Sequence, residues 1–245
     1  MFNSKKVKDE IVQWTKKYFE ENATLETKAV VGISGGKDSS VVAALCVEAL
    51  GKERVYGVLM PQGEQGDIDV SLDLCKALGI DYVVLNIKEP IDLLYEEFNS
   101  KDLKLNDVAT FNTPARIRMT TIYAVSAMVG GRVANTCNLS EDWVGYATKF
   151  GDGAGDFSLL SSLTVTEVKS VGKELGLSDK FTEKVPIDGL CGKTDEENLG
   201  FTYEVLDKYI REGVCNNMEV KEKIDYLNKI NLHKVRPMAM YKMLG

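Results

Sequence analysis

The segment that most constrains the fold is a glycine turn that joins an apolar run to a helical pattern. Ala29 to Ile33 predicts a buried parallel strand, and Val41 to Leu45 predicts a buried helix. Between them lies Ser34-Gly35-Gly36-Lys37-Asp38-Ser39. A strand, a turn and a helix start bring several backbone N–H groups and the positive end of the helix dipole to one point. Glycines let an anion approach the main chain, so the segment predicts a phosphate site.

The spacing of this turn separates it from the Walker A loop. A Walker A loop has four residues between its glycines, and Ser or Thr follows its lysine. Here the spacing counted from Gly32 is one residue short, and Asp38 follows Lys37. Ser-Gly-Gly-x-Asp-Ser instead resembles the PP-loop of the N-type ATP pyrophosphatases, enzymes that hold the pyrophosphate of ATP and transfer AMP to a carboxyl or carbonyl oxygen. The alternative, a plain strand–turn–helix corner, needs only one glycine.

The remaining pattern alternates short apolar runs with helical stretches. We expect strands at 29–33, 54–60, 82–87 and 132–136, and helices at 7–19, 41–50, 69–78, 113–129, 167–175, 203–211 and 220–230. This order predicts an α/β fold with a doubly wound parallel sheet, and ligands bind such sheets at the carboxyl ends of the strands. Residues 91–106 are expected to be irregular, Pro114 to open its helix, and residues 148–158 and 186–194 to form loops. With no repeat or linker, residues 1–245 are expected to form one domain.

Composition restricts the class of protein. The chain has 245 residues, 44% of them hydrophobic, which suits one sizeable core. A net charge of −7 with interleaved acids and bases argues against general nucleic-acid binding. No apolar run approaches a membrane span and no early stretch resembles a leader, so we expect no membrane partner and a cytoplasmic location. The five cysteines form no C-x-x-C pair, which suits a reducing compartment and neither a zinc site nor a disulfide framework.

Beyond the loop, five motifs resemble those of the ammonia-dependent NAD synthetases in order and spacing. They are Ala115-Arg116-Ile117-Arg118-Met119, Asn135-Thr136 with Glu141, Thr148-Lys149-Phe150-Gly151-Asp152-Gly153 with Asp156, Thr194-Asp195-Glu196-Glu197 with Leu199-Gly200-Phe201, and His233-Lys234 with Arg236-Pro237. The resemblance runs from about residue 5 to the end. It implies a Rossmann-like domain of the adenine nucleotide alpha hydrolase type. It also implies a homodimer.

The resemblance implies a two-step amidation. ATP adenylates the nicotinate carboxylate of deamido-NAD and releases pyrophosphate, and ammonia then displaces AMP to give NAD. A carboxylate is a poor acceptor for ammonia, and the adenylate supplies a leaving group, so the protein mainly orients and neutralises charge. Triphosphate requires Mg²⁺, which prefers carboxylate and phosphate oxygens. The glutaminase domain that some relatives carry has no room here, so we expect ammonia to be free or delivered by a partner.

The same resemblance assigns the site residues. Asp38 and Lys37 are expected to be catalytic, and Asp38 and Glu141 to hold Mg²⁺. The expected ATP contacts are Gly32, Ile33, Ser34, Gly35, Gly36, Lys37, Asp38, Ser39 and Thr136. The expected deamido-NAD contacts are Arg116, Lys149, Asp156, His233 and Lys234. Six of these residues also have an interpretation without a ligand, which we call the plain reading. It takes Asp38 as a helix N-cap, Glu141, Lys149 and Asp156 as solvated charges, Arg116 as a surface ion-pair partner, and His233 as a structural residue.

Some positions depart from the family pattern. Asn135 and Cys137 replace Gly and Asp, Val165 stands where the family has a lysine that reaches the ATP phosphates, and Ile187 replaces a hydroxyl residue. A lost cation would weaken ATP binding by on the order of 1.5–3 kcal/mol. Lys37, Lys169 and Lys193 are the candidate replacements. Two other functions therefore stay open: a different PP-loop amidating or thiolating ligase, and a nucleotide-binding paralogue that does not turn over.

Overall fold

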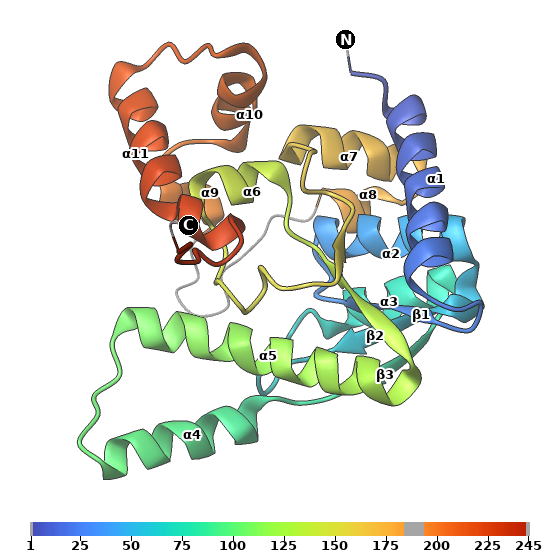
Figure 1. Ribbon diagram of the computed structural model, residues 1–245, viewed down its shortest axis with the longest axis horizontal. Coiled ribbons are helices and arrows are strands. Elements are labelled where there is room, and N and C mark those ends of the chain that lie inside the picture. Colours follow the sequence, from blue (N-terminus) through green and yellow to red (C-terminus); the bar gives the residue numbers. More distant parts are fainter. Residues whose placement is uncertain (1, 184–193, 244–245) are drawn as a thin grey trace.

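A computed structural model describes residues 2–183 and 194–243 of the chain. Its centre is a five-stranded sheet in the order β3-β2-β1-β4-β5, with every neighbouring pair parallel (Figure 1). The strands are β1 Lys28–Gly32, β2 Val55–Leu59, β3 Asp81–Val84, β4 Gly131–Asn135 and the short β5 Phe157–Ser158. The predicted doubly wound parallel sheet is confirmed. The sequence pattern did not predict β5, which has only two residues and lies inside the expected glycine loop.

Helices cover both faces of the sheet. One face carries α1 Ser4–Asn22, α2 Lys37–Leu50, α3 Ile68–Leu78, α7 Val165–Glu174 and α8 Asp179–Thr182, with a short 3-10 turn at Lys52–Arg54. The other face carries α5 Asp107–Val129, and α4 Lys88–Ser100 packs outside it (Figure 1). Successive residues of β1 point to opposite faces: Val31 joins the core under α2, and Val30 joins the core under α5.

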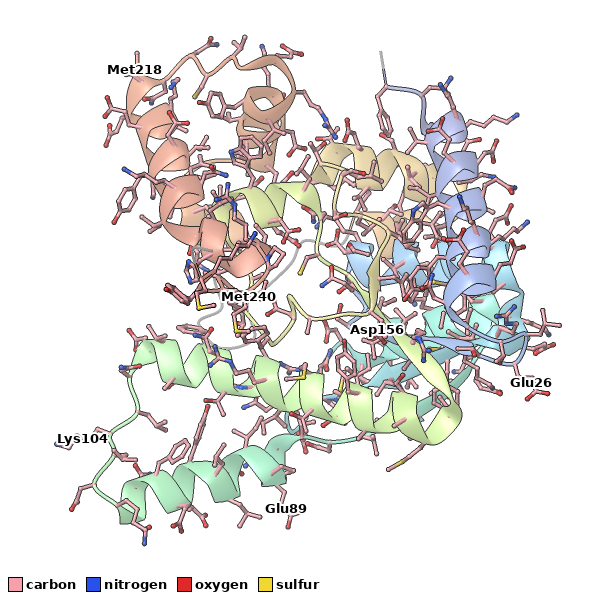
Figure 2. The ribbon with its side chains drawn as sticks, in the orientation of Figure 1. Glu26, Glu89, Lys104, Asp156, Met218 and Met240 are labelled. Carbon is pink, nitrogen blue, oxygen red and sulfur yellow. The ribbon has the colours of Figure 1, made fainter. Side chains whose placement is uncertain are left out.

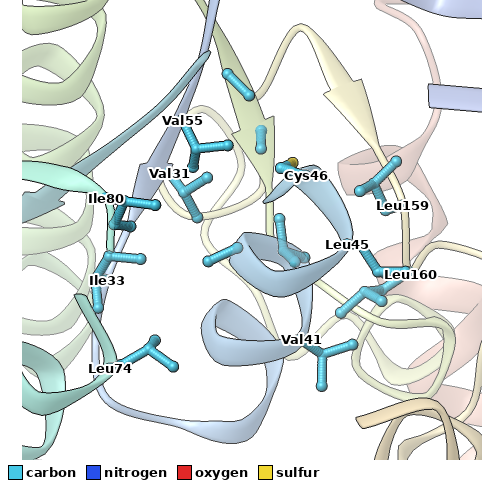
Figure 3. Packing of buried hydrophobic residues seen from close by; sticks show 14 of the residues in the cluster. Val31, Ile33, Val41, Leu45, Cys46, Val55, Leu74, Ile80, Leu159 and Leu160 are labelled. Atoms are coloured by element: carbon cyan, nitrogen blue, oxygen red, sulfur yellow. The ribbon is translucent and has the colours of Figure 1, made fainter. Parts of the chain in front are cut away.

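The larger core forms between the sheet and α2. Val31, Val41 and Leu45 are fully buried there, and side chains from β2 and from the segment before α7 pack against them (Figure 3). Burial of this apolar surface is the main stabilisation of the fold and fixes the first turn of α2 against β1. The start of α2 is therefore held rigidly at the carboxyl end of β1.

The order in which strands are added to the sheet reverses between β1 and β4. Strands β2 and β3 extend the sheet on one side of β1, and β4 and β5 extend it on the other. The loops that follow β1 and β4 therefore leave the same edge of the sheet, and Asn138 after β4 contacts Asp38 at the start of α2. Such a switch point is where open parallel sheets bind ligands. It brings the glycine turn at 33–36 next to residues 136–138, about a hundred positions later in the chain.

Two expectations for residues 88–129 are wrong. The segment 91–106 is helical over α4, where Ile91, Leu94, Tyr95 and Phe98 recur at helical spacing, and α5 begins after its N-cap Asn106, well before Pro114. Pro114 thus lies inside a helix, where it cannot donate a hydrogen bond to the Thr110 carbonyl. The Tyr95 hydroxyl of α4 donates to that carbonyl at 3.3 Å instead. The contact between the helices replaces the missing bond.

The remaining helices form a second, smaller cluster. They are α6 Leu139–Val144, α9 Asp195–Leu199, α10 Tyr203–Glu212 and α11 Met218–Val235, and their apolar side chains pack with Val165. The last two confirm predicted helices, whereas the sequence pattern left α6, α8 and α9 unassigned. The predicted loop 186–194 lies almost wholly outside the described residues. In the described part of the chain, no helix is both long and apolar enough to cross a membrane.

Candidate active site

The glycine turn forms an open cradle at the end of β1. Gly35 has a left-handed backbone with φ +76°, which suits glycine. The hydroxyls of Ser34 and Ser39 lie 3.1 Å apart and close the turn, and the N–H of Gly36 donates to the Ser34 hydroxyl at 3.3 Å. The first N–H groups of α2 have no acceptor within the helix, so they are available to an anion. The predicted ATP contacts Gly32 to Ser39 are all on this turn.

Lys37 and two carboxylates form a buried charged cluster at the cradle. The Lys37 ammonium donates to Oδ2 of Asp38 at 2.8 Å and lies 4.0 Å from Oε1 of Glu141, and its side chain is only 2% exposed. Burial acts to lower the pKa of Lys37, but the carboxylates of Asp38 and Glu141 outweigh it, so the pKa is raised. Lys37 is therefore a permanent cation. The structure thus brings together the predicted catalytic and metal residues.

The plain reading of Asp38 as an N-cap is wrong. Gly36 occupies the N-cap position of α2, and Asp38 lies in the first helical turn without capping it. Its carboxylate instead accepts hydrogen bonds from Lys37 and from the side-chain amide of Asn138, the latter at 3.0 Å. A carboxylate in the first turn is still favoured by the helix dipole. Each carboxylate oxygen of Asp38 thus has one donor, Lys37 for Oδ2 and Asn138 for Oδ1.

Glu141 is held by the start of α6. Asn138 caps this helix, and the Glu141 carboxylate accepts from the Asn138 backbone N–H at 3.3 Å, a capping box. Burial and the nearby Asp38 carboxylate raise the pKa of Glu141 well above its usual range, against the opposing effect of Lys37. Glu141 is thus not the solvated helix residue of the plain reading. Thr136 lies half-buried between β4 and this cap.

The donor set fits a hard divalent cation that also binds phosphate. Asp38 and Glu141 supply two carboxylates next to the anion cradle, with side chains 18% and 15% exposed. Among the described residues, no group of three or more His, Cys, Asp or Glu side chains is arranged to hold a metal ion. Mg²⁺ is commonly held by one or two carboxylates together with substrate phosphates and waters. Two carboxylates beside a phosphate cradle match that pattern.

The five predicted dinucleotide contacts gather around Lys149. The Lys149 ammonium donates to the His233 carbonyl at 2.5 Å, and the Arg116 guanidinium donates to the Lys149 carbonyl at 3.4 Å. Lys234 donates to the carbonyl of Gly145 at 2.7 Å. Lys149, Asp156 and Lys234 all line one pocket of about 240 Å³, which also reaches Asn135 at the end of β4. Segments 84 residues apart in the chain therefore meet in one site.

Asp156 has a structural role as well. This residue immediately precedes β5 and is labelled in Figure 2. Its Oδ2 accepts from the backbone N–H of Val133 at 2.7 Å, and Oδ1 accepts from the Tyr123 hydroxyl at 3.3 Å. The carboxylate thereby attaches the loop to the middle of β4. Because the residue is exposed and lines the pocket, it is placed to face a ligand while it anchors the loop.

The departures from the family pattern have structural partners. The Asn135 amide donates to the carbonyls of Asp152 and Ala154 at 3.0 and 3.3 Å, and the Cys137 thiol donates to the same Asp152 carbonyl at 3.4 Å. These two residues hold the glycine loop against β4. Val165 is 6% exposed and packs in the second core, whereas the Lys169 ammonium donates to Glu183 at 2.9 Å. Ile187 and Lys193 lie outside the described residues.

Three residues near the cradle were missed as site residues. Asn138 contacts both Asp38 and Glu141, and Asp195 and Tyr203 lie close enough to Lys37 to influence it. Burial raises the pKa of the Asp195 carboxyl, which accepts a hydrogen bond from Tyr203 at 3.3 Å. The sequence did carry one signal for Asn138. An asparagine three residues before a glutamate is the start signature of a helix, and it places that glutamate close to the cap.

Comparison with known proteins agrees with this geometry. The chain is 36% identical to the NH(3)-dependent NAD(+) synthetase of Pyrococcus furiosus, over 96% of this chain and 93% of the relative. A structure of NMN synthetase from Francisella tularensis superposes with a TM-score of 0.88 at 29% identity, covering 99% of this chain and 100% of that one. The NH3-dependent NAD synthetase of Campylobacter jejuni, in complex with nitrate, superposes with a TM-score of 0.78 at 25% identity, covering 99% and 100%. The NAD synthase family model matches residues 7–243, and the chain belongs to that family.

Proposed function

We propose that this protein converts deamido-NAD to NAD with ammonia, and that it cleaves ATP to AMP and pyrophosphate to do so. The observation that carries the proposal is the position of two sites at the same edge of the sheet. The phosphate cradle with Lys37 and Asp38 follows β1, and the pocket with Lys149, Asp156 and Lys234 lies beside β4. Because β1 and β4 are adjacent, a nucleotide in one site faces a ligand in the other.

The cradle supports the adenylation step. The N–H groups of residues 35–39 bind the phosphates of ATP, and Lys37 neutralises charge on the pyrophosphate that leaves. Mg²⁺, held by Asp38 and Glu141, supplies further charge neutralisation on the phosphate oxygens. Thr136, at the end of β4, contacts the nucleotide from the other side of the switch point. The proposed work of the chain is orientation and electrostatics, without a covalent nucleophile.

The pocket supports binding of the second nucleotide. Lys149 and Lys234 line the pocket with their side chains, and the Arg116 guanidinium and the His233 backbone carbonyl both contact Lys149. The planar fork of Arg116 is suited to a phosphate oxygen pair, and Lys149 and Lys234 add point charges. Asp156 is proposed to accept hydrogen bonds from the ligand. These roles belong to the proposed deamido-NAD site.

A homodimer is part of the proposal. Helix α4, the first two turns of α5 and the loop between them expose four large apolar side chains: Leu93, Leu103, Val108 and Phe111. The loop that carries Lys104 lies at the periphery of the molecule (Figure 2). Apolar groups on an outer helix pair favour association with a second copy. Phe111→Glu should shift the mass measured by light scattering from that of a dimer to that of a monomer.

We also propose a cytoplasmic location, because the described cysteines are free thiols.

A mononucleotide substrate is the second candidate. The structural match to an NMN synthetase, with its TM-score of 0.88, is closer than the match to the Campylobacter NAD synthetase at 0.78. The chemistry would be the same, but the carboxylate that is adenylated and amidated would be that of nicotinic acid mononucleotide in place of deamido-NAD. The two substrates differ in the adenylyl half, so the phosphate cradle does not distinguish them. Only a direct competition between the substrates does.

One assay tests both candidates. The purified protein is supplied with Mg-ATP and ammonium, with deamido-NAD or nicotinic acid mononucleotide or an equimolar mixture, and the amidated product and pyrophosphate are measured. We expect NAD from deamido-NAD only when Mg-ATP and ammonium are both present, and little product with glutamine in place of ammonium. Preference for the mononucleotide in the mixture would support the second candidate. Equal rates with glutamine and ammonium, or no product from either nucleotide, would refute the ammonia-dependent reaction.

A further inference from the structure

Asn138 donates hydrogen bonds to both proposed metal carboxylates, one from its side-chain amide and one from its backbone N–H. Its side chain is fully buried between the start of α6 and the first turn of α2. Its Oδ1 accepts from the backbone N–H groups of Ser140 and Glu141, at 3.0 and 3.1 Å, and so caps α6. Its Nδ2 donates to Oδ1 of Asp38 at 3.0 Å. A single short side chain thus joins two segments that are a hundred residues apart.

These contacts divide the carboxylate oxygens into two sets. Asn138 donates a hydrogen bond to one oxygen of each carboxylate. Its side-chain amide donates to Oδ1 of Asp38 at 3.0 Å, and its backbone N–H donates to Oε2 of Glu141 at 3.3 Å. The other two oxygens, Oδ2 of Asp38 and Oε1 of Glu141, face the Lys37 ammonium at 2.8 and 4.0 Å. The two carboxylate oxygens that Asn138 does not contact are therefore the ones that face the Lys37 ammonium. The Asn138 side chain is shorter than that of Lys37 and has fewer rotatable bonds, so it restricts the orientation of the Asp38 carboxylate more tightly.

We propose that Asn138 is a positioning residue, which presents one oxygen of Asp38 and one oxygen of Glu141 to the divalent cation that accompanies ATP. The proposal rests on the function proposed above. Asn138 itself touches neither substrate nor cation. It keeps the Asp38 carboxylate from rotating about its terminal bond, and it holds Glu141 back against the cap of α6. Without the amide donor, Asp38 has only the flexible Lys37 side chain as a partner in this cluster.

The test is Asn138→Ser, with Asn217→Ser as its matched control. Serine is a good N-cap, so the cap of α6 is retained while the amide that reaches Asp38 is lost. Asn217 caps α11 through the same pair of backbone contacts, at 3.0 and 3.3 Å, and its side-chain oxygen accepts only from backbone N–H groups in the described part of the chain. Binding of Mn²⁺ to the protein with a non-hydrolysable ATP analogue is measured by electron paramagnetic resonance. The Mg²⁺ concentration that gives half-maximal activity is measured in parallel.

We expect Asn138→Ser to need about tenfold more divalent cation in both measurements, with most activity restored at high Mg²⁺, and Asn217→Ser to behave as wild type. A purely structural role would lower the melting temperature without moving the cation dependence, and that result would overturn the proposal. If Asn138→Ser is too unstable, Asn138→Thr serves with the same readouts. Failure of the proposed function is separable: the wild type would then make no amidated product, while Mn²⁺ binding with the ATP analogue still tests Asn138.

Discussion

The Lys37 ammonium lies 2.8 Å from Oδ2 of Asp38, its neighbour in the chain, and the lysine side chain is buried beside the phosphate cradle. The same ammonium is 4.0 Å from Oε1 of Glu141. In the free protein, a lysine of the loop therefore sits between the two carboxylates proposed to hold Mg²⁺. A divalent cation bound at that position would compete with the lysine for the same oxygens. Mg-ATP would relieve this competition, because its phosphates would offer the ammonium another partner.

Replacement of Lys37 should affect the two ligands in opposite directions. Lys37→Met keeps the length of the side chain but removes its charge. ATP affinity should fall ten- to a hundredfold, about 1.5–3 kcal/mol, because a charged hydrogen bond to phosphate is lost. Mn²⁺ should bind the ATP-free protein more tightly than it binds wild type, because the carboxylates lose their internal cation. Calorimetry and paramagnetic resonance measure the two effects.

Lys169→Met is the control for this prediction. Lys169 pairs with Glu183 on an exposed face of α7 and should leave both ligands unaffected. Weaker binding of both Mn²⁺ and ATP to Lys37→Met would contradict the competition, since it would mean that the buried charge only supports the local fold.

Asp38→Asn should separate catalysis from folding. The amide keeps the size of the side chain but loses the charge that the cation requires, so turnover should fall at least a hundredfold, about 2.7 kcal/mol of barrier. Because Asp38 does not cap α2, helix stability should change little through capping. The cost to folding comes from Lys37, which loses its nearest carboxylate and keeps Glu141 at 4.0 Å and the more distant Asp195. Steady-state rates and thermal melting are compared. A collapsed melting temperature with normal activity per folded molecule would refute the catalytic role.

Local sequence signals located the cradle well. The predicted strand at 29–33 and helix ending at Leu50 correspond to β1 Lys28–Gly32 and α2 Lys37–Leu50, because apolar burial, glycine turns and the Gly51 stop all act within a few residues. Helix α4 was missed because the pattern after residue 91 is short and rich in charged residues, and Pro90 lies in the first turn of this helix. Proline costs little in the first turn, where its N–H would have no partner. Its apolar stripe at helical spacing was the signal that outweighs the proline.

The contacts between distant segments were not predictable in the same way. The bond from Asn138 to Asp38 exists only because β4 pairs with β1, and an alternating pattern of strands and helices does not specify strand order. The resemblance to the family named residues such as Lys149 and His233 without their partners. Their mutual contact depends on how α11 packs on α6, which is long-range packing. The types of the candidate site residues could be predicted from the sequence, but their positions relative to one another depend on the fold.

The end of α11 should matter more for the dinucleotide than for ATP. Lys149 donates to the His233 carbonyl, and Lys234 donates to the Gly145 carbonyl beside the pocket. His233→Ala combined with Lys234→Ala removes an imidazole and an ammonium from that surface, so deamido-NAD should bind at least tenfold more weakly, about 1.4 kcal/mol, with a much smaller change for ATP. Calorimetric titration of each ligand measures this. Lys229→Ala, an exposed change on the same helix, is the control. Equal losses for both ligands would indicate a folding or dimer role.

The buried cysteines should resist alkylation at pH 8. Burial raises the pKa of Cys46 to about 12 and that of Cys75 to about 11, so both thiols stay protonated, and the reactive thiolate is at most about one part in a thousand. Burial also raises the pKa of Cys137 well above its usual value. Cys215 is half-buried and accessible. Peptide mapping after brief treatment with N-ethylmaleimide should find Cys215 modified first among these four cysteines, and all four modified in guanidinium. Fast labelling of Cys46 in the native protein would contradict the described core.

A lysine at position 165 should fail to improve ATP binding. Val165 is 6% exposed and packs with Leu199 and Tyr203 in the second core, so Val165→Lys would place an ammonium among apolar side chains. The free energy of unfolding should fall by about 2–4 kcal/mol, because a buried charge without a partner is costly. Val165→Met is the matched control, since it tests the added length without the charge and should cost less. The nearest loop cation, Lys37, already lies at the cradle, so we expect no gain in ATP affinity for either variant. Urea unfolding and calorimetry measure the two quantities. A stable Val165→Lys protein that binds ATP tenfold more tightly, together with unchanged ATP binding in Lys37→Met, would show instead that the cradle lacks a cation and that this chain is a weakened relative of the enzymes it resembles.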